Sequence, residues 1–501
     1  MESEASLWTH SMSNIFCFCF FSFTAFFSLF SLFIFVLRLK PWCNCDVCRS
    51  YLKSTWLKDF DNLCDCYTHL LAKSPTGTIH LHVLGNIVTS NPENVEYILK
   101  TRFDNYPKGQ PFSVLLGDLL GRGIFNVDGD SWKFQRKMAS FELGSVSIRS
   151  YAFEIVSTEI RSRLIPLLSS VADQEKAFDL QDVFRRFSFD NICKFSFGLD
   201  PGCLKLNLPI SEFAVAFDLA SKLSAERALS PSQMIWKIKR LFNIGSEKKL
   251  KESIKLVNQL AEKMIHHRRQ KGFSDKNDLL SRFMGSINDE KYLRDIVVSF
   301  LLAGRDTVAS GLTSFFWLIS QHPEVQSAIR EESERVVGPD NNTDLANFEQ
   351  MRNMHYLNAA IYESMRLYPP VQFDSKFARE DDILPDGTFV RKGNRITYHP
   401  YAMGRMERIW GPDCLKFKPD RWLKNGKFVP ENPFKYPVFQ AGLRVCLGKD
   451  MALVAMKSVA HAVIMRFDIQ VADPNKAPMF APGLTATVRG GLPVLVQERR
   501  C

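Results

Sequence analysis

The sequence Phe439-Gln440-Ala441-Gly442-Leu443-Arg444-Val445-Cys446-Leu447-Gly448 decides the fold of this protein, because it places one cysteine in a glycine-flanked loop. A helical pattern follows directly, from Lys449 to Met465. A thiolate at position 446 would lie at the N-terminus of that helix, where backbone N–H groups and the helix dipole stabilise negative charge. The two glycines permit a tight backbone, and the arginine can pair with an anionic group.

A buried free cysteine and a phosphate-binding loop are the alternatives for this stretch. A phosphate loop needs four residues between its glycines and a Ser or Thr after its lysine. Here five residues separate Gly442 from Gly448, and Asp450 follows Lys449. The stretch resembles instead the haem-binding loop of the cytochrome P-450 family, in which a cysteine thiolate is the axial ligand of the iron and favours O–O cleavage.

This resemblance implies a haem pocket and a fold. Cys446 would bind the iron of haem b, and the same loop would contribute Phe439, Gly442, Arg444 and Gly448 to the pocket. The implied fold is mainly α with small β-sheets, a cytochrome P-450 fold behind a single N-terminal transmembrane helix. The patterns agree with it, since residues 254–265 carry an apolar stripe of period 3.6 and Thr78–Ser90 alternates around Gly85-Asn86 as a hairpin does.

An E-x-x-R pair, Glu363 and Arg366, lies on one helical face, and a P-D-R-W sequence containing Arg421 follows it before the cysteine loop. The family carries both elements in this order, and its Glu-Arg-Arg network maps onto these three residues. Such a network would hold the cysteine loop in place. Glu332 and Arg335 have the same spacing without that context, and we expect an ordinary solvated face there.

The sequence Ala303-Gly304-Arg305-Asp306-Thr307 lies inside a long helical pattern, Tyr292–Ser320. In isolation it could be an exposed polar turn. It resembles the family's oxygen-activation motif, which implies that Gly304 opens space beside the cofactor, Thr307 hydrogen-bonds to the oxygen being activated, and Asp306 relays protons. Val308 stands where another hydroxyl residue is common, which leaves the proton path open.

The Trp132-x-x-x-Arg136 sequence places an indole N–H and a guanidinium one helical turn apart. Both groups could bind the haem propionates, with Arg444 as a third candidate and Lys376 as a fourth. A surface cation–π contact is the alternative for the Trp–Arg pair.

The N-terminus predicts a membrane anchor. Residues 15–37 carry no charge and include ten phenylalanines, and such a helix is about 35 Å long, enough to cross a bilayer. A cleaved signal peptide is disfavoured because no Lys or Arg precedes the stretch. Since Arg38 and Lys40 follow it, the positive-inside rule places the rest of the chain in the cytosol, at the endoplasmic reticulum membrane. The expected division is a lumenal tail (1–14), the anchor (15–37), a juxtamembrane segment (38–60) and a haem-thiolate monooxygenase domain (61–501).

The cytosolic location also bears on the 12 cysteines, because a reducing compartment disfavours disulfides. Cys43, Cys45 and Cys48, followed by Cys64 and Cys66, superficially resemble a zinc site, but the second pair is C-x-C. We expect solvated or membrane-proximal thiols, with zinc binding as the alternative.

Several stretches resemble the plant fatty-acid ω-hydroxylase group of the family, namely residues 117–126, 398–411 and 439–451. The segments 43–48 and 371–378 look closest to its jasmonoyl-isoleucine-oxidising branch. That resemblance implies oxidation at the ω-carbon of jasmonoyl-isoleucine or its 12-hydroxy derivative, through to the 12-carboxy form. Free fatty acids are the alternative substrates, and a haem-thiolate isomerase or dehydratase and an anchored interaction protein are the alternative functions.

A lipophilic carboxylate needs an apolar path to the iron and a cation at its far end. The candidates for the cation are Arg122 and Lys108. The candidates for the path are Phe112, Leu115, Leu116, Phe125, Phe213, Phe217, Ala303 and Leu484. Ordinary core packing is the alternative for each of them.

The charge balance is modestly basic, with 64 Lys+Arg against 54 Asp+Glu and a net charge of +10. No run of five basic residues occurs, so nucleic-acid binding has no support. The chain has no dinucleotide fingerprint or flavin domain, and the resemblance implies that O₂ is reduced with electrons from NADPH through a separate membrane-bound NADPH–cytochrome reductase. An acidic surface on that partner would suit the basic excess.

Overall fold

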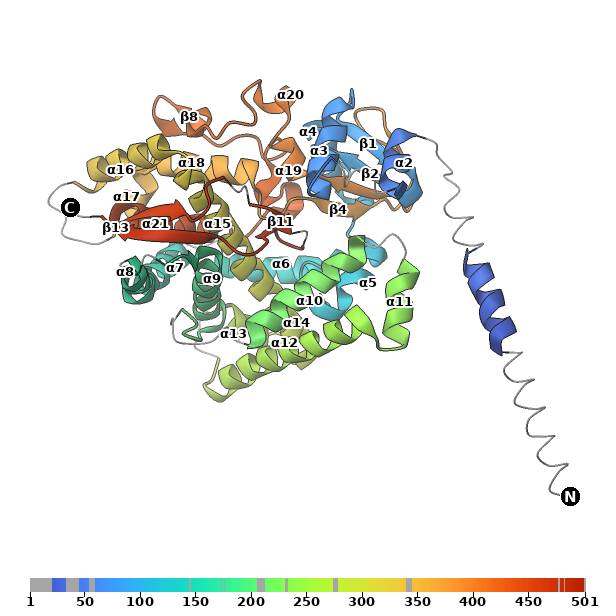
Figure 1. Ribbon diagram of the computed structural model, residues 1–501. Helices are drawn as coiled ribbons and strands as arrows, with labels where there is room; N and C mark the ends of the chain where they lie inside the picture. The colour runs from blue at the N-terminus through green and yellow to red at the C-terminus, as the bar shows by residue number, and fades with distance from the viewer. Residues whose placement is uncertain are drawn as a thin grey trace, which may run out of the picture.

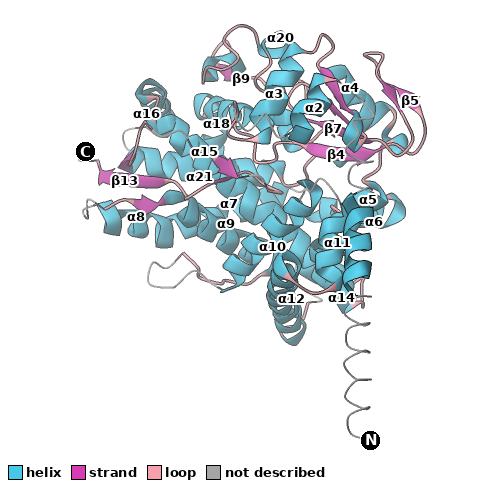
Figure 2. Ribbon diagram, turned by 45° about the vertical axis from the view of Figure 1, so that its right-hand side comes forward, coloured by secondary structure: helices cyan, strands magenta, loops and turns pink. Residues whose placement is uncertain are grey.

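A computed structural model describes residues 20–32, 45–53, 59–143, 146–172, 174, 176–204, 212–229, 233–273, 278–338, 345–475, 478–481 and 483–499. Helices make up most of it, and the strands are short and grouped in small sheets (Figures 1 and 2). The prediction of a mainly helical chain with small sheets is therefore confirmed.

The labelled helices are α2 (Asp46–Lys53), α3 (Leu63–Lys73), α4 (Pro92–Glu96), α5 (Gly109–Leu120), α6 (Gly129–Leu143), α7 (Val146–Glu159), α8 (Ile165–Ala172), α9 (Leu180–Phe197), α10 (Glu212–Leu229), α11 (Gln233–Leu241), α12 (Gly245–Gln270), α13 (Leu279–Met284), α14 (Glu290–Leu301), α15 (Thr307–Ser320), α16 (Pro323–Val337), α17 (Phe348–Asn353), α18 (His355–Leu367), α19 (Pro400–Met403), α20 (Glu407–Trp410) and α21 (Lys449–Arg466). The strands are β1 (Thr78–Leu81), β2 (Asn86–Thr89), β3 (Phe178–Asp179), β4 (Asp374–Phe377), β5 (Asp382–Ile383), β6 (Phe389–Val390), β7 (Arg395–Tyr398), β8 (Leu423–Lys424), β9 (Lys427–Phe428), β10 (Phe467–Val471), β11 (Phe480–Ala481), β12 (Thr487–Val488) and β13 (Pro493–Glu498).

A four-stranded sheet of order β1-β2-β7-β4 joins residues 78–89 to residues 374–398. The predicted hairpin is confirmed, because β1 and β2 pair antiparallel and Gly85 turns the chain at a φ of 56°. Strand β7 pairs parallel with β2 and antiparallel with β4. The sheet thus places the first strands of the chain beside segments some 300 residues later (Figure 1).

One long helix crosses the core as α14, a π-helical turn η6 (Leu302–Asp306) and α15. Within the described residues, Glu290–Ser320 is long and apolar enough to span a membrane, but 78% of its most apolar window is buried inside the domain. It is therefore a core helix. A Cβ at Gly304 would lie 2.4 Å from the Ile192 side chain, so the requirement for glycine there comes from packing against α9.

The shorter apolar helix Phe20–Leu32 carries exposed phenylalanines, including Phe21 at 70% exposure. It occupies the middle of the predicted anchor. Residues 15–19 and 33–37 of that anchor, and the predicted tail 1–14, lie outside the described residues.

The structure brings Glu363, Arg366 and Arg421 together in a buried network. The Glu363 carboxylate accepts hydrogen bonds from Arg366 Nε at 2.7 Å and from Arg421 Nε at 2.9 Å. Arg366 also donates to the carbonyl of Cys414 at 2.6 Å and to that of Gly404. These bonds tie α18 to the segment 404–422, and within the described residues none of them reaches the cysteine loop itself.

The prediction of a solvated face at Glu332 and Arg335 is wrong for Glu332. Glu332 is not on a solvated face: it is buried, and its carboxylate accepts hydrogen bonds from the backbone N–H groups of Tyr356 and Leu357 at 2.7 and 2.8 Å, at the start of α18. It satisfies N–H groups that a helix start leaves unpaired. Arg335 is exposed, as expected.

Of the thiols predicted to be solvated or membrane-proximal, three are not solvated, and Cys45 is half-buried. Cys48, Cys64 and Cys66 are free and buried, and burial raises the pKa of Cys64 to about 12. The described residues include no group of three His, Cys, Asp or Glu side chains that could hold a metal, and Cys43 lies outside them.

Removing the charge of Glu363 should destabilise the domain strongly. Glu363→Gln keeps the shape of the side chain but leaves buried Arg366 without its counterion, and we expect a loss of about 3–5 kcal/mol. A thermal melt followed by circular dichroism measures it. The control is Glu349→Gln, which removes an exposed partner of Arg352 and should change stability by at most about 1 kcal/mol. Equal melting midpoints for the two variants would contradict a stabilising role for the network.

Candidate active site

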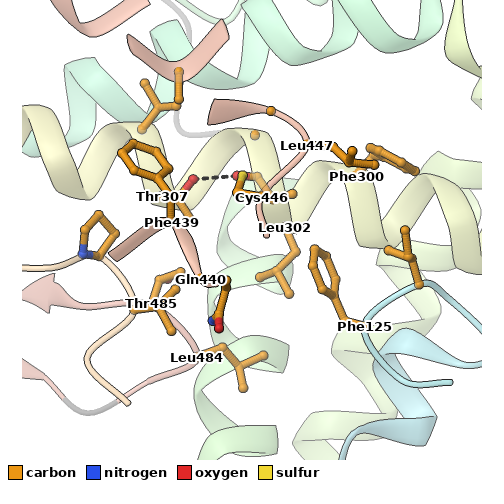
Figure 3. A pocket seen from close by; sticks show the side chains of 18 of the residues that line it. Phe125, Phe300, Leu302, Thr307, Phe439, Gln440, Cys446, Leu447, Leu484 and Thr485 are labelled. Atoms are coloured by element: carbon orange, nitrogen blue, oxygen red, sulfur yellow. Dashed lines mark hydrogen bonds between the residues drawn. The ribbon is translucent and has the colours of Figure 1, made fainter. Parts of the chain in front are cut away.

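A cavity of about 440 Å³ lies where the core helix, the cysteine loop and β4 meet. Most of its lining is apolar, with Phe300, Leu302 and Leu447 among the side chains drawn in Figure 3. Thr307 and Cys446 both face it (Figure 3).

The cysteine loop is closed by its own backbone. The N–H group of Cys446 donates to the carbonyl of Phe439 at 2.8 Å. Gln440 and Gly442 both adopt a φ of 61°, so the chain reverses sharply between the two 3₁₀ turns η8 (Pro437–Phe439) and η9 (Gly442–Arg444). A Gln with positive φ and extended ψ is rare and costs about 1–3 kcal/mol unless its surroundings hold it. Here the hydroxyl of Tyr398 donates to its side-chain carbonyl.

The two glycines of the loop differ in whether a side chain would fit in their place. A Cβ at Gly442 would lie 2.1 Å from the carbonyl oxygen of Leu99, so only glycine fits there. Gly448 has a φ of −87°, which any residue adopts, and no described atom lies within 4 Å of its added Cβ. The prediction that both glycines permit the tight backbone is right for Gly442 and wrong for Gly448, which instead lines the cavity before α21.

The environment of the Cys446 thiol acts in two directions. Burial raises its pKa, while the backbone N–H of Gly448 and the positive charges of Arg136 and Lys449 lower it. The N–H group belongs to the start of α21, as the sequence predicted. A sulfur in this position can bind a metal as thiolate, since coordination removes the proton.

The four predicted propionate ligands all line the cavity: Trp132, Arg136, Lys376 and Arg444. The guanidinium of Arg444 lies 4.6 Å from the Trp132 ring and donates to Asp128 at 2.6 Å. Its Nε is buried and has no hydrogen-bond partner in the described part of the chain. Arg136 donates to the carbonyl of Val445. A cluster of cations with an unused donor fits a group that carries two carboxylates beside a thiolate-bound metal, as haem does.

The oxygen-activation motif is split between two environments. Thr307 faces the cavity and donates to the carbonyl of Ala303 at 2.5 Å. Asp306 does not line the cavity: it is buried beside Arg305, whose Nη1 lies 2.7 Å from its Oδ1 and 2.6 Å from Asp218. Burial raises the pKa of Asp306, and Arg305 opposes that shift.

Six of the predicted substrate residues line the cavity: Phe112, Leu115, Leu116, Phe125, Ala303 and Leu484. Phe213 and Phe217 do not, because they lie nearer the start of α10 than its lining residues Ala225 and Ala228 and pack with the hydrophobic core, with ring centroids 5.5 Å apart. The prediction that Arg122 binds the substrate carboxylate is also wrong. Its side chain is half exposed, pairs with Asp289 and lies 4.5 Å from the Tyr292 ring. Lys108, the other candidate cation, does line the cavity.

Sequence reasoning missed other lining residues, among them Phe300, Phe373, Arg395 and Thr485. The first continues the apolar pattern before the Ala303 motif, which could have marked it. The others come from strands and loops that only the tertiary structure brings to the cavity.

Comparison with known proteins gives the family. The cytochrome P450 family model matches residues 54–493. The chain is 64% identical over 485 residues to cytochrome P450 94C1 of Arabidopsis thaliana, covering 96% of this chain and 98% of the relative. It is 47% identical to cytochrome P450 94B1 of Arabidopsis thaliana (88% of each chain) and 45% identical to cytochrome P450 94A1 of Vicia sativa (85% of each chain).

The chain therefore belongs to the cytochrome P450 family. It is a haem-thiolate monooxygenase that uses O₂ and electrons from NADPH delivered by a redox partner, of the plant fatty-acid and jasmonate ω-hydroxylase group.

Gly442→Ala should prevent the cysteine loop from forming. The added methyl group would collide with the Leu99 carbonyl, and we expect most of the purified protein to lack haem, measured as the ratio of haem to protein absorbance. Gly490→Ala is the control, because Gly490 also has a positive φ, 80°, but open space around its added Cβ. Haem loading of Gly442→Ala equal to that of Gly490→Ala would contradict the collision.

Proposed function

We propose that this enzyme oxidises the ω-carbon of a carboxylate-bearing lipophilic substrate, jasmonoyl-isoleucine or 12-hydroxy-jasmonoyl-isoleucine, through to the 12-carboxy form. One observation carries the choice of substrate: much of the segment 371–378, whose sequence looks closest to the jasmonate-oxidising branch, lies in the cavity wall. Val371, Phe373 and the residues of β4 all line the cavity. Substrate selection in such a cavity depends on the side chains of its wall.

Free fatty acids are the second candidate substrates. Lining side chains such as Phe112, Leu116 and Leu484 suit an acyl chain as well as a cyclopentane ring. An isomerase or dehydratase is disfavoured, because Thr307 presents a hydroxyl to the cavity beside Cys446, which suits oxygen activation.

In this proposal the chain's own residues have distinct tasks. Haem, when bound, supplies the activation of O₂ and the insertion of one oxygen atom into a C–H bond. Cys446 would ligate its iron, and Trp132, Arg136, Arg444 and Lys376 would hold its propionates. The apolar wall excludes water and orients the substrate, and Thr307 would hold a proton at the reacting centre. Asp306 would exchange protons from behind it, while Arg305 stays protonated and holds Asp306 and Asp218 in place.

The proposed location is the endoplasmic reticulum membrane, with residues 1–14 in the lumen, 15–37 across the bilayer, and the catalytic domain after segment 38–60 in the cytosol, where it meets NADPH–cytochrome reductase. The exposed phenylalanines of Phe20–Leu32 support the span. Helix α11 supports a membrane-facing domain surface, because Met234, Ile235 and Ile238 are about half exposed beside Lys237.

Cys446→Ser should abolish both the thiolate signature and turnover. The reduced carbon monoxide complex of the wild type is expected to absorb near the position typical of thiolate ligation, and the variant should lose that band together with product formation. Cys414→Ser, which changes a buried free thiol that does not line the cavity, is the control. An active Cys446→Ser enzyme would refute the ligand assignment.

Product analysis tests the substrate. Microsomes that contain the full chain and a plant reductase are incubated with jasmonoyl-isoleucine, with its 12-hydroxy derivative and with dodecanoic acid, and the products are identified by mass spectrometry. We expect NADPH-dependent hydroxy and carboxy products of the jasmonate conjugates. Consumption of the fatty acid alone would overturn the jasmonate assignment, and products formed without NADPH would overturn monooxygenation.

A further inference from the structure

The cations at the β4 end of the cavity differ in how they are compensated. Lys108 and Lys376 share the carboxylate of Asp374 as counterion, and Nζ of Lys376 lies 3.3 Å from it. Arg444 pairs with Asp128 at 2.6 Å. Arg395 also lines the cavity, but it takes part in no ion pair within the described part of the chain.

Arg395 lies on the opposite face of the β4–β7 ladder from Lys376. The pairing is Lys376↔Ile396 and Phe377↔Arg395, and side chains alternate between faces along a strand. Two sets of contacts agree with this assignment. On one face, the Tyr398 hydroxyl and Lys376 both contact the carboxylate of Asp374. On the other face, the Ser375 hydroxyl forms a hydrogen bond with the Thr397 hydroxyl and accepts one from Arg395 Nε at 2.9 Å.

The Lys376 face is the one that joins the haem-binding residues. Tyr398 on this face donates to Gln440 of the cysteine loop, and Asp374 is shared with Lys108. Arg395 is thus separated from the cations that suit the propionates by the thickness of the strand pair. It would therefore not be one of the residues that hold the haem propionates.

The surroundings of Arg395 favour an anion. Its side chain is half-buried, and its Nη groups form no ion pair with a carboxylate of the described residues. Its charge acts on Tyr51 and Tyr67, whose pKa values burial raises and Arg395 lowers, so two phenol groups lie nearby. Burial lowers the pKa of the guanidinium itself, while Tyr67, Tyr51 and the more distant carboxylate of Asp374 offset only part of this cost, and a bound anion would offset more of it.

We infer that Arg395 is a specificity-determining residue that binds the carboxylate of the substrate while the ω-end lies beside Thr307 and Cys446. The inference rests on the proposed function, since it supplies the anionic end of that substrate class. A guanidinium can hold a carboxylate by two parallel hydrogen bonds, which fixes the orientation of the chain as well as its affinity. The structure thus selects neither of the two cations expected from the sequence, Arg122 and Lys108, for this task.

Spectral titration of the haem-loaded full chain tests this inference without turnover. The probes are jasmonoyl-isoleucine and dodecanoic acid, each compared with its methyl ester, and the readout is the change in haem absorbance on binding. We expect the wild type to bind each acid at least about tenfold more tightly than its ester, and Arg395→Met to bind both forms alike. Arg395→Lys should keep part of the preference, because it retains the charge but not the paired donors.

Two controls make the outcome decisive. Arg391→Met removes an exposed arginine of the same strand connection and should leave the acid preference unchanged. Lys108→Met addresses the rival cation. A wild type that does not distinguish acid from ester, a preference that survives in Arg395→Met, or one that disappears in Lys108→Met but not in Arg395→Met, would each overturn the inference.

The test also separates this inference from the proposed reaction. An acid preference that depends on Arg395, in an enzyme that forms no ω-oxidised product, would leave the binding role standing and end the proposed reaction. Formation of the ω-oxidised products by an enzyme without an acid preference would leave the proposed reaction standing and end the binding role of Arg395.

Discussion

A thiolate at the wall of an apolar cavity has to be held against the cost of its own desolvation, and the residues around Cys446 follow from this constraint. Burial raises the pKa of the thiol, and the Gly448 N–H group, Arg136 and Lys449 act against it. The loop itself is kept in one conformation by the bond from the Cys446 N–H to the Phe439 carbonyl and by the close approach of Gly442 to Leu99. A sulfur fixed in this way does not have to reorganise when it binds a metal.

The same cavity has an uneven charge distribution. Its apolar part lies along the core helix, while its cations come from α6, the cysteine loop, the β4–β7 ladder and Lys108 at the start of α5. Asp374 and Asp128 compensate only some of them, so the wall retains positive charge. In a medium of low dielectric constant such a wall selects anionic partners, which suits both a cofactor with two carboxylates and a substrate with one.

The core helix shows how context changes the meaning of an apolar sequence. Glu290–Ser320 has the length and hydropathy of a membrane span, yet it is buried on most sides by protein. Its π-helical turn lies where the helix passes the cavity, and π turns of this kind are common at functional sites. The turn directs Thr307 into the cavity and leaves Asp306 on the side of Arg305 and Asp218.

Short-range chemistry made much of this protein predictable from its sequence alone. The cysteine loop, the E-x-x-R pair, the hairpin at Gly85 and the long core helix depend on residues that are neighbours in the chain, so their spacing reveals them. Only the tertiary structure decided which phenylalanines and which cations reach the cavity. Phe213 turned into the core and Arg122 to the surface, while Arg395 entered the cavity wall. The carboxylate of Glu332 likewise accepts a hydrogen bond from a backbone N–H group 24 residues away. Such outcomes depend on the direction of a side chain and on contacts between distant segments, and one sequence carries no local signal for either.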